Sequence, residues 1–199
     1  MIIQIFLLFS VCRRGLDIAL IIDNSFSIFR NFPTYIKRIV ELVNNFDVGP
    51  NKVRIGAVHF SSSAFLAFPL NKFTSKAAVA AAIKAIPGPG GQTNLADAMR
   101  KARTQLLVSP GDRKDAPNAC LLFTDGIATR EKNATETEAN LLKPLCTLTT
   151  VSIGTDTDKS QLRRISSQNR FFETPSFDFL KLIEANLTKV LCEVPEGKN

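Results

Sequence analysis

The chain has 199 residues, of which 45% are hydrophobic and 22% charged, and its formal net charge at pH 7 is +7. This length suits one domain, and the hydrophobic content excludes an intrinsically disordered chain. A single histidine, His59, excludes a histidine-rich zinc site and leaves little material for hydrolytic catalysis.

Strands and helices are predicted to alternate along most of the chain. Residues 16–22 are a nearly continuous apolar run that ends at Asp23, as in a strand buried on both faces. After it we expect, in chain order, a helix at 33–46, strands at 52–60 and 64–68, helices at 74–86 and 94–108, a strand at 119–123, a helix at 131–143, a strand at 148–153, a helix at 159–166, a strand at 170–173 and a helix at 176–191. This order predicts a doubly wound α/β fold, in which a mostly parallel sheet has one antiparallel edge strand and helices cover both faces.

The two ends of the chain indicate a secreted module. Residues 1–11 form an apolar run that is too short to cross a bilayer but suits a signal peptide, although Arg13 and Arg14 follow it rather than precede it. The alternative for this run is a buried strand at the start of a fragment. The polar tail at 194–199 is typical of a linker into a further module, which leaves 12–193 as the domain.

The four cysteines favour the same extracellular location. Cys12 and Cys192 bracket the domain, and because domain termini often lie close together, a bridge between them would close nearly the whole fold. Cys120 and Cys146 are either a second bridge or two buried thiols. The absence of any Cys-x-x-Cys sequence disfavours zinc and redox chemistry. Two acceptor sequences for N-linked glycosylation are also present, at Asn133 and Asn186.

Acidic and hydroxyl side chains follow the predicted parallel strands, at the sheet edge where such folds bind ligands. Asp23 is followed by Ser25 and Ser27, Asp125 follows a second strand, and a Pro-Gly loop places Thr93 at the start of a helix. These two carboxylates and three hydroxyls offer only oxygen, which suits a hard divalent cation, Mg²⁺ or Mn²⁺. Helix capping is the simpler role for Asp23 and Ser27 alone, but the complete set favours a metal site.

The set resembles the metal-ion-dependent adhesion site of von Willebrand factor A domains, also called integrin inserted domains. Asp23, Ser25 and Ser27 match the family motif Asp-x-Ser-x-Ser, Thr93 matches its distant threonine, and Asp125 matches its Thr-Asp-Gly aspartate. The resemblance covers nearly the whole chain. It implies that the hydroxyls bind the ion directly, that the two aspartates alternate between direct and water-mediated contact, and that an Asp or Glu of a partner protein completes the octahedron.

By this resemblance the chain is expected to be a non-enzymatic adhesion module of a secreted or cell-surface protein. Its partner would be a matrix protein such as collagen or another cell-surface protein, and parasite-surface adhesins carry the same kind of domain. The positive net charge would steer an acidic ligand toward the site and does not indicate nucleic acid.

Two alternatives remain open. The first is a polyanion-binding surface for sulfated glycans, built from the basic residues Arg13, Arg14, Arg163, Arg164 and Arg170. The second is a Mg²⁺-dependent phosphatase of the haloacid dehalogenase type, which also begins at a strand-ending aspartate. That chemistry needs a second aspartate where this chain has Ser25, so catalysis is not expected.

Overall fold

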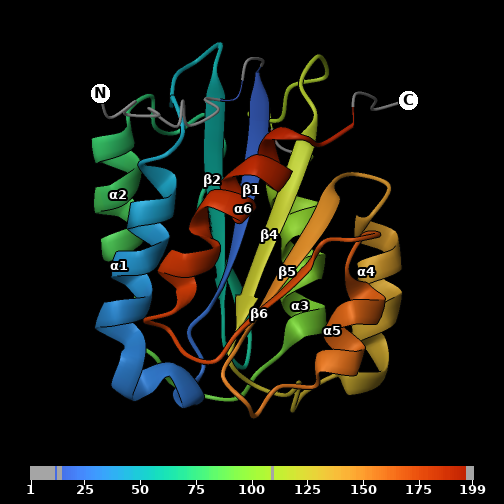
Figure 1. The fold of residues 1–199 in the computed structure, drawn as a ribbon. Coiled ribbons are helices and arrows are strands. Elements are labelled where there is room, and N and C mark those ends of the chain that lie inside the picture. Colours follow the sequence, from blue (N-terminus) through green and yellow to red (C-terminus); the bar gives the residue numbers. More distant parts are fainter. Residues whose placement is uncertain (1–11, 13–14, 109, 196–199) are drawn as a thin grey trace, which may run out of the picture.

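The apolar strand segments assemble into one six-stranded sheet at the centre of the molecule (Figure 1). The structure is a computed structural model that describes residues 12, 15–108 and 110–195, so the predicted signal peptide at 1–11 and the end of the tail, 196–199, lie outside the described residues. The strands are β1 (Leu16–Asp23), β2 (Val53–Phe60), β3 (Ala64–Phe68), β4 (Asn118–Thr124), β5 (Thr147–Ile153) and β6 (Phe171–Thr174), in the spatial order β3-β2-β1-β4-β5-β6. Neighbouring strands are parallel except for the edge pair β2 and β3, which is antiparallel, so the predicted fold class is confirmed.

Helices cover both faces of this sheet. They are α1 (Phe32–Val43), α2 (Lys76–Lys84), α3 (Leu95–Lys101), α4 (Thr135–Leu142), α5 (Lys159–Ile165) and α6 (Leu180–Cys192), with short turns of other helix types at η1 (Phe26–Asn31), η2 (Ala102–Leu106) and η3 (Lys132–Ala134). In β1, alternate side chains such as Leu20 and Ile22 pack with α1, α2 and α6, whereas Ala19 and Ile21 pack with α3, α4 and α5. The nearly continuous apolar run of β1 therefore reflects burial on both faces.

Most of the predicted helix bounds shift by one to four residues, and two of the differences have a clear structural cause. The last helix begins at Leu180 rather than at residue 176, because the preceding turn inserts Phe177 into the core, with its ring centroid 5.3 Å from that of Tyr35. The helix predicted at 94–108 is α-helical only to Lys101 and continues as the π-helix η2, whose end is marked by the bond from the N–H of Leu107 to the carbonyl of Ala102.

Two disulfide bonds join the cysteines. Cys12 and Cys192 are bridged, with their Cα atoms 5.0 Å apart, which ties the segment before β1 to the last residue of α6. Cys120 and Cys146 are also bridged, so the choice between a bridge and free thiols is decided, and this second bridge lies in the core between β4 and the start of β5. Among the helices of the described residues, none combines the length and hydrophobicity needed to cross a membrane.

Candidate functional site

The two aspartates predicted as ligands come together because β1 and β4 are adjacent and parallel. Asp23 is the last residue of β1 and Asp125 follows the last residue of β4, so both lie at the carboxyl edge of the sheet, the lower edge in Figure 1. Asp23 is fully buried, and its carboxylate accepts bonds from the N–H of Ser25 (2.8 Å) and from the hydroxyl of Thr124 (2.7 Å). These two donors fix the orientation of the carboxylate.

The three hydroxyls form a chain of hydrogen bonds that ends on the second aspartate. Thr93 Oγ1 donates to Ser25 Oγ (3.1 Å), Ser25 Oγ lies 3.0 Å from Ser27 Oγ, and Ser27 Oγ donates to Asp125 Oδ1 (2.6 Å). The five side chains predicted as ligands therefore belong to one cluster, to which Asp23 is attached through the backbone of Ser25.

Glycines make room for this cluster. A Cβ on Gly126 would lie 3.2 Å from Thr93 Oγ1, closer than side chains ordinarily approach, and 3.4 Å from Ser27 Oγ. In the Pro-Gly loop, Gly91 has φ +78° and its carbonyl accepts the N–H of Phe26, which holds the serine-bearing segment. Steric crowding therefore explains the glycine of the Thr-Asp-Gly sequence, and the positive φ explains the glycine at position 91 of the Pro-Gly loop.

Burial disfavours the charged forms of both aspartates. It raises the pKa of Asp23 to about 7, and it also raises the pKa of Asp125. A cavity of about 510 Å³ opens beside Asp125, and Asp156 and Asp178 line it as well. No lysine, arginine or histidine is found among the described residues of its lining, so the excess positive charge of the chain does not lie at the cavity itself.

The donor chemistry fits a hard cation. Within the part of the chain that the structure describes, no three His, Cys, Asp or Glu side chains gather in a group that could hold a metal ion. Two carboxylates and three hydroxyls supply oxygen alone, and a cation among them would balance the buried charge of Asp23.

Thr124 and Thr129 belong to this site but were not singled out from the sequence. Thr124 hydrogen-bonds to Asp23, and Thr129 accepts a bond from the N–H of Thr93 (2.9 Å) through its hydroxyl. Thr124 had one available signal, its place directly before Asp125 in the Thr-Asp-Gly sequence. Thr129 had none, because its role depends on a contact between distant loops.

An aromatic pair stands exposed next to the serines. Phe26, between Ser25 and Ser27, is 67% exposed, and its ring stacks on that of Phe29, which is 59% exposed, with centroids 5.8 Å apart. Exposed aromatic side chains of this size are more typical of partner-binding surfaces than of free surface.

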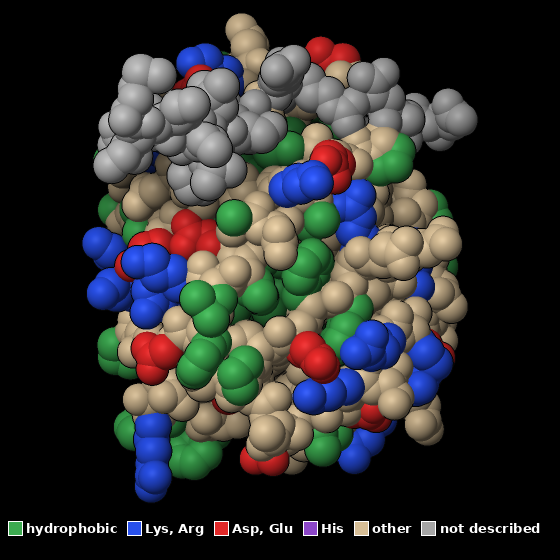
Figure 2. All heavy atoms as spheres, viewed as in Figure 1, with side chains coloured by type: hydrophobic (Ala, Val, Ile, Leu, Met, Phe, Trp, Pro, Cys, Tyr) green, Lys and Arg blue, Asp and Glu red, His purple; other side chains and the backbone are tan. Residues whose placement is uncertain are grey.

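The arginines proposed for glycan binding are largely engaged within the protein. Arg163 lies 3.7 Å from Glu173, Arg164 donates to Glu136 (2.8 Å), and Arg170 donates to backbone carbonyls at the end of α6, including that of Glu193 (3.1 Å). Arg13 and Arg14 lie outside the described residues. On the face in Figure 2, basic side chains stand beside acidic ones and form no continuous basic patch.

A doubly wound sheet that gathers hydroxyl and carboxylate oxygens at its carboxyl edge defines a class of binding domain. The chain belongs to the von Willebrand factor type A domain family, whose sequence model matches residues 17–186. The curated relatives it matches include the human collagen alpha-1(XXI) chain, 27% identical over 92% of this chain and 19% of the collagen, and the human collagen alpha-6(VI) chain, 30% identical over 88% of this chain and 8% of the collagen. The chain thus spans less than a fifth of the length of these collagens.

Solved structures agree with the fold. Proximal thread matrix protein 1 from the mussel byssus, solved with a zinc-occupied MIDAS motif, is 30% identical over 92% of this chain and 47% of that chain, with a TM-score of 0.83. The manganese-loaded TRAP protein of Plasmodium vivax is 21% identical over 89% of this chain and 75% of that chain, with a TM-score of 0.73. Collagens and a thread matrix protein are thus among the relatives of this domain, which is a non-enzymatic module.

Proposed function

We propose that the domain binds a divalent cation through Asp23, Ser25, Ser27, Thr93 and Asp125 and uses it to capture an acidic residue of a partner protein. One observation carries the proposal: five oxygen-bearing side chains from three separate loops converge, and one of them, the buried carboxylate of Asp23, has no positively charged partner among the described residues. A structural role in capping a helix would not need all three loops to meet.

Mg²⁺ or Mn²⁺ suits this donor set best, because both prefer oxygen ligands in octahedral geometry. One solved relative has zinc in its MIDAS motif and the other is loaded with manganese, which supports a divalent cation in general. The bound cation would supply a coordination position for the carboxylate of the partner. Thr124 and the Ser25 N–H hold the Asp23 carboxylate in one orientation, so little rearrangement of that side chain is needed for binding.

An extracellular matrix or cell-surface protein is the partner class we propose. The collagens among the relatives and the two disulfides favour this location, since disulfides persist in oxidising compartments. Asn133 and Asn186 are both exposed, so glycans attached to them would be accommodated. The exposed pair of Phe26 and Phe29 provides apolar contact surface next to the captured carboxylate.

Two measurements test the proposal. The first is calorimetric titration with Mg²⁺ and Mn²⁺, and the second is solid-phase binding to collagens, laminin and heparin with and without EDTA. Asp23→Ala and Thr93→Ala should each weaken cation binding by about tenfold or more, and EDTA should abolish binding to the protein partners. Thr137→Ala serves as the matched control, because it removes an exposed hydroxyl on α4. It should change neither cation binding nor binding to the protein partners.

Two results would overturn the proposal. The first is cation binding that survives Asp23→Ala. The second is binding that ignores EDTA, is confined to heparin and weakens steeply with salt, which would establish the polyanion surface instead.

A further inference from the structure

The Thr93 hydroxyl is positioned through the backbone, by the loop that follows β4. The N–H of Thr93 donates to Thr129 Oγ1 (2.9 Å), and its carbonyl accepts the N–H groups of Thr129 (2.9 Å) and Arg130 (3.2 Å). The position of Thr93 Oγ1 next to Ser25 Oγ therefore depends on where this loop lies.

Glu131 ends that loop in a conformation that few residues adopt. Its φ of 45° and ψ of 35° are left-handed, which is unfavourable for a residue with a Cβ and persists only where the surroundings enforce it. Both carboxylate oxygens are engaged, since Oε1 accepts from Asn94 Nδ2 (2.9 Å) and Oε2 accepts from the Arg100 guanidinium (2.7 Å). Asn94 directly follows Thr93, so the Glu131 side chain holds the Thr93 segment a second time.

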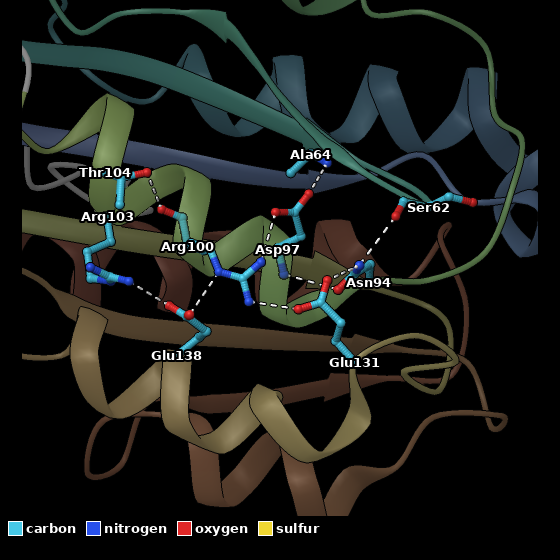
Figure 3. A network of polar contacts seen from close by, with 9 residues as sticks. All are labelled: Ser62, Ala64, Asn94, Asp97, Arg100, Arg103, Thr104, Glu131 and Glu138. Carbon is cyan, nitrogen blue, oxygen red and sulfur yellow. Dashed lines mark hydrogen bonds and ion pairs between the residues drawn. The ribbon is translucent and has the colours of Figure 1, made fainter.

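Arg100 is itself fixed in place, as Figure 3 shows. Its guanidinium donates to Glu138 on α4 (2.9 Å) and to Asp97 on its own helix (3.2 Å), in addition to Glu131. The second oxygen of Asp97 accepts the N–H of Ala64 at the start of β3 (2.7 Å). The network thus joins β3, α3 and α4 into one support beneath the Thr93 segment.

We infer that Glu131 is a positioning residue of the cation site, which sets the place of the Thr93 hydroxyl through Asn94 and the loop that Glu131 ends. This inference rests on the cation-binding function proposed above. Glu131 is 37 positions from Asn94 and 31 from Arg100 in sequence, and its carboxylate connects two of the three loops that form the site.

The chain offers a matched control for the loss of an ion pair. Glu136 on α4 pairs with Arg164 at 2.8 Å, and its side chain is 47% exposed, against 2.7 Å and 42% for Glu131 with Arg100. Glu136 has no contact with the Thr93 segment among its described hydrogen bonds and ion pairs.

Three variants test the inference: Glu131→Gly, which accepts the left-handed backbone without strain; Glu131→Gln, which keeps an acceptor for Asn94 but loses the charge; and Glu136→Ala as the control. In EDTA, hydrogen exchange of the Thr129 and Arg130 amides reports directly on the bonds to Thr93 without any metal. Calorimetry with Mg²⁺ and with Mn²⁺ then measures cation affinity. Melting temperature reports whether each variant is folded.

Glu131→Gly is expected to speed exchange of both amides and to raise the Kd for the cation by about tenfold, with a smaller rise for Glu131→Gln and no change for Glu136→Ala. Unchanged amide exchange and unchanged Kd in both Glu131 variants would overturn the inference. Faster exchange with normal cation affinity would overturn it too. The proposed function fails separately, if Asp23→Ala leaves cation binding intact.

Discussion

Asp23 combines two requirements that conflict when no cation is bound. Its carboxylate is fully buried, and burial raises its pKa to about 7, although Thr124 and Ser25 donate hydrogen bonds that favour the charged form. Near neutral pH the metal-free protein therefore holds either a buried charge or a proton that the cation must displace. Cation affinity at this site is expected to be weaker in acid for that reason.

The stability of the metal-free protein should consequently depend on pH through Asp23. The pKa of Asp23 in the folded state lies above the ordinary aspartate value of 3.8, so the folded state binds the proton more tightly than the unfolded state. The contribution of this proton to the free energy of unfolding is complete below about pH 4 and is lost as pH rises through about 7. Its upper limit is about 4 kcal/mol.

Urea unfolding of the wild type and of Asp23→Asn in EDTA, from about pH 4 to pH 8, measures this contribution. The difference in unfolding free energy between the two proteins isolates the contribution of Asp23. Other groups change stability with pH in the opposite direction, such as Glu131, whose pKa is lowered mainly by Arg100. Mg²⁺ should restore the stability of the wild type near neutral pH. If the unfolding free energies of the wild type and Asp23→Asn differ by the same amount at every pH, this account of Asp23 is contradicted.

Among single residues, those at strand ends could be located from the sequence and those that act through distant contacts could not. Asp23 and Asp125 each follow a recognisable apolar run, so the topology alone brings them together. Thr124 also ends a strand, but its bond to Asp23, 101 positions away, has no local signal, and neither has the bond of Glu131 to Asn94, 37 positions away. Side-chain networks of this kind depend on how loops pack, which periodicity does not encode.

At the scale of elements, the edge hairpin depends on a glycine in β2. A Cβ on Gly56 would lie 2.6 Å from Leu106 Cδ1, 3.0 Å from the backbone nitrogen of Leu70 and 3.2 Å from the carbonyl oxygen of Phe68. Gly56 therefore permits η2 and the segment after β3 to pack directly on β2.

We expect Gly56→Ala to lower the free energy of unfolding by about 1–3 kcal/mol, because two of the three atoms in the way belong to the backbone and move only with their segment. Gly88→Ala, where a Cβ meets nothing within 4 Å, should be neutral or stabilise by up to about 1 kcal/mol. Urea denaturation of both variants decides the matter. Equal stability of the two would show that the close approach at Gly56 is easily relieved.

The order of elements and the parallel sheet followed from the sequence because apolar runs and turn residues alternate clearly. The start of α6 was placed too early because the residues from 176 also suit a helix, and only the burial of Phe177 against Tyr35 keeps this turn from joining it. The π-helical turn at η2 was missed because its residues have ordinary helical periodicity.

At the scale of the whole molecule, the two disulfides constrain the unfolded chain to different extents. The Cys12–Cys192 bridge spans 180 positions and the Cys120–Cys146 bridge spans 26. Loop-closure entropy predicts contributions of about 5 and about 3.5 kcal/mol, respectively, as upper values.

Replacing Cys12 and Cys192 together by alanine should therefore lower the free energy of unfolding by several kcal/mol, up to about 5, in urea titrations. Cation affinity should not change, because this bridge lies beside the start of β1, at the edge of the sheet opposite to Asp23. A double variant within about 1 kcal/mol of the wild type would show that α6 and β1 hold together without the bridge.

The bridge also determines how the domain would carry mechanical load. Cys12 and Cys192 have Cα atoms 5.0 Å apart, and the strands and helices of the described residues all fall within the sequence that this pair brackets. Tension applied through the chain on either side of this pair would pass across one covalent bond and bypass the sheet. The cluster around Asp23, at the far edge, would keep its shape under forces that would pull an unbridged domain open.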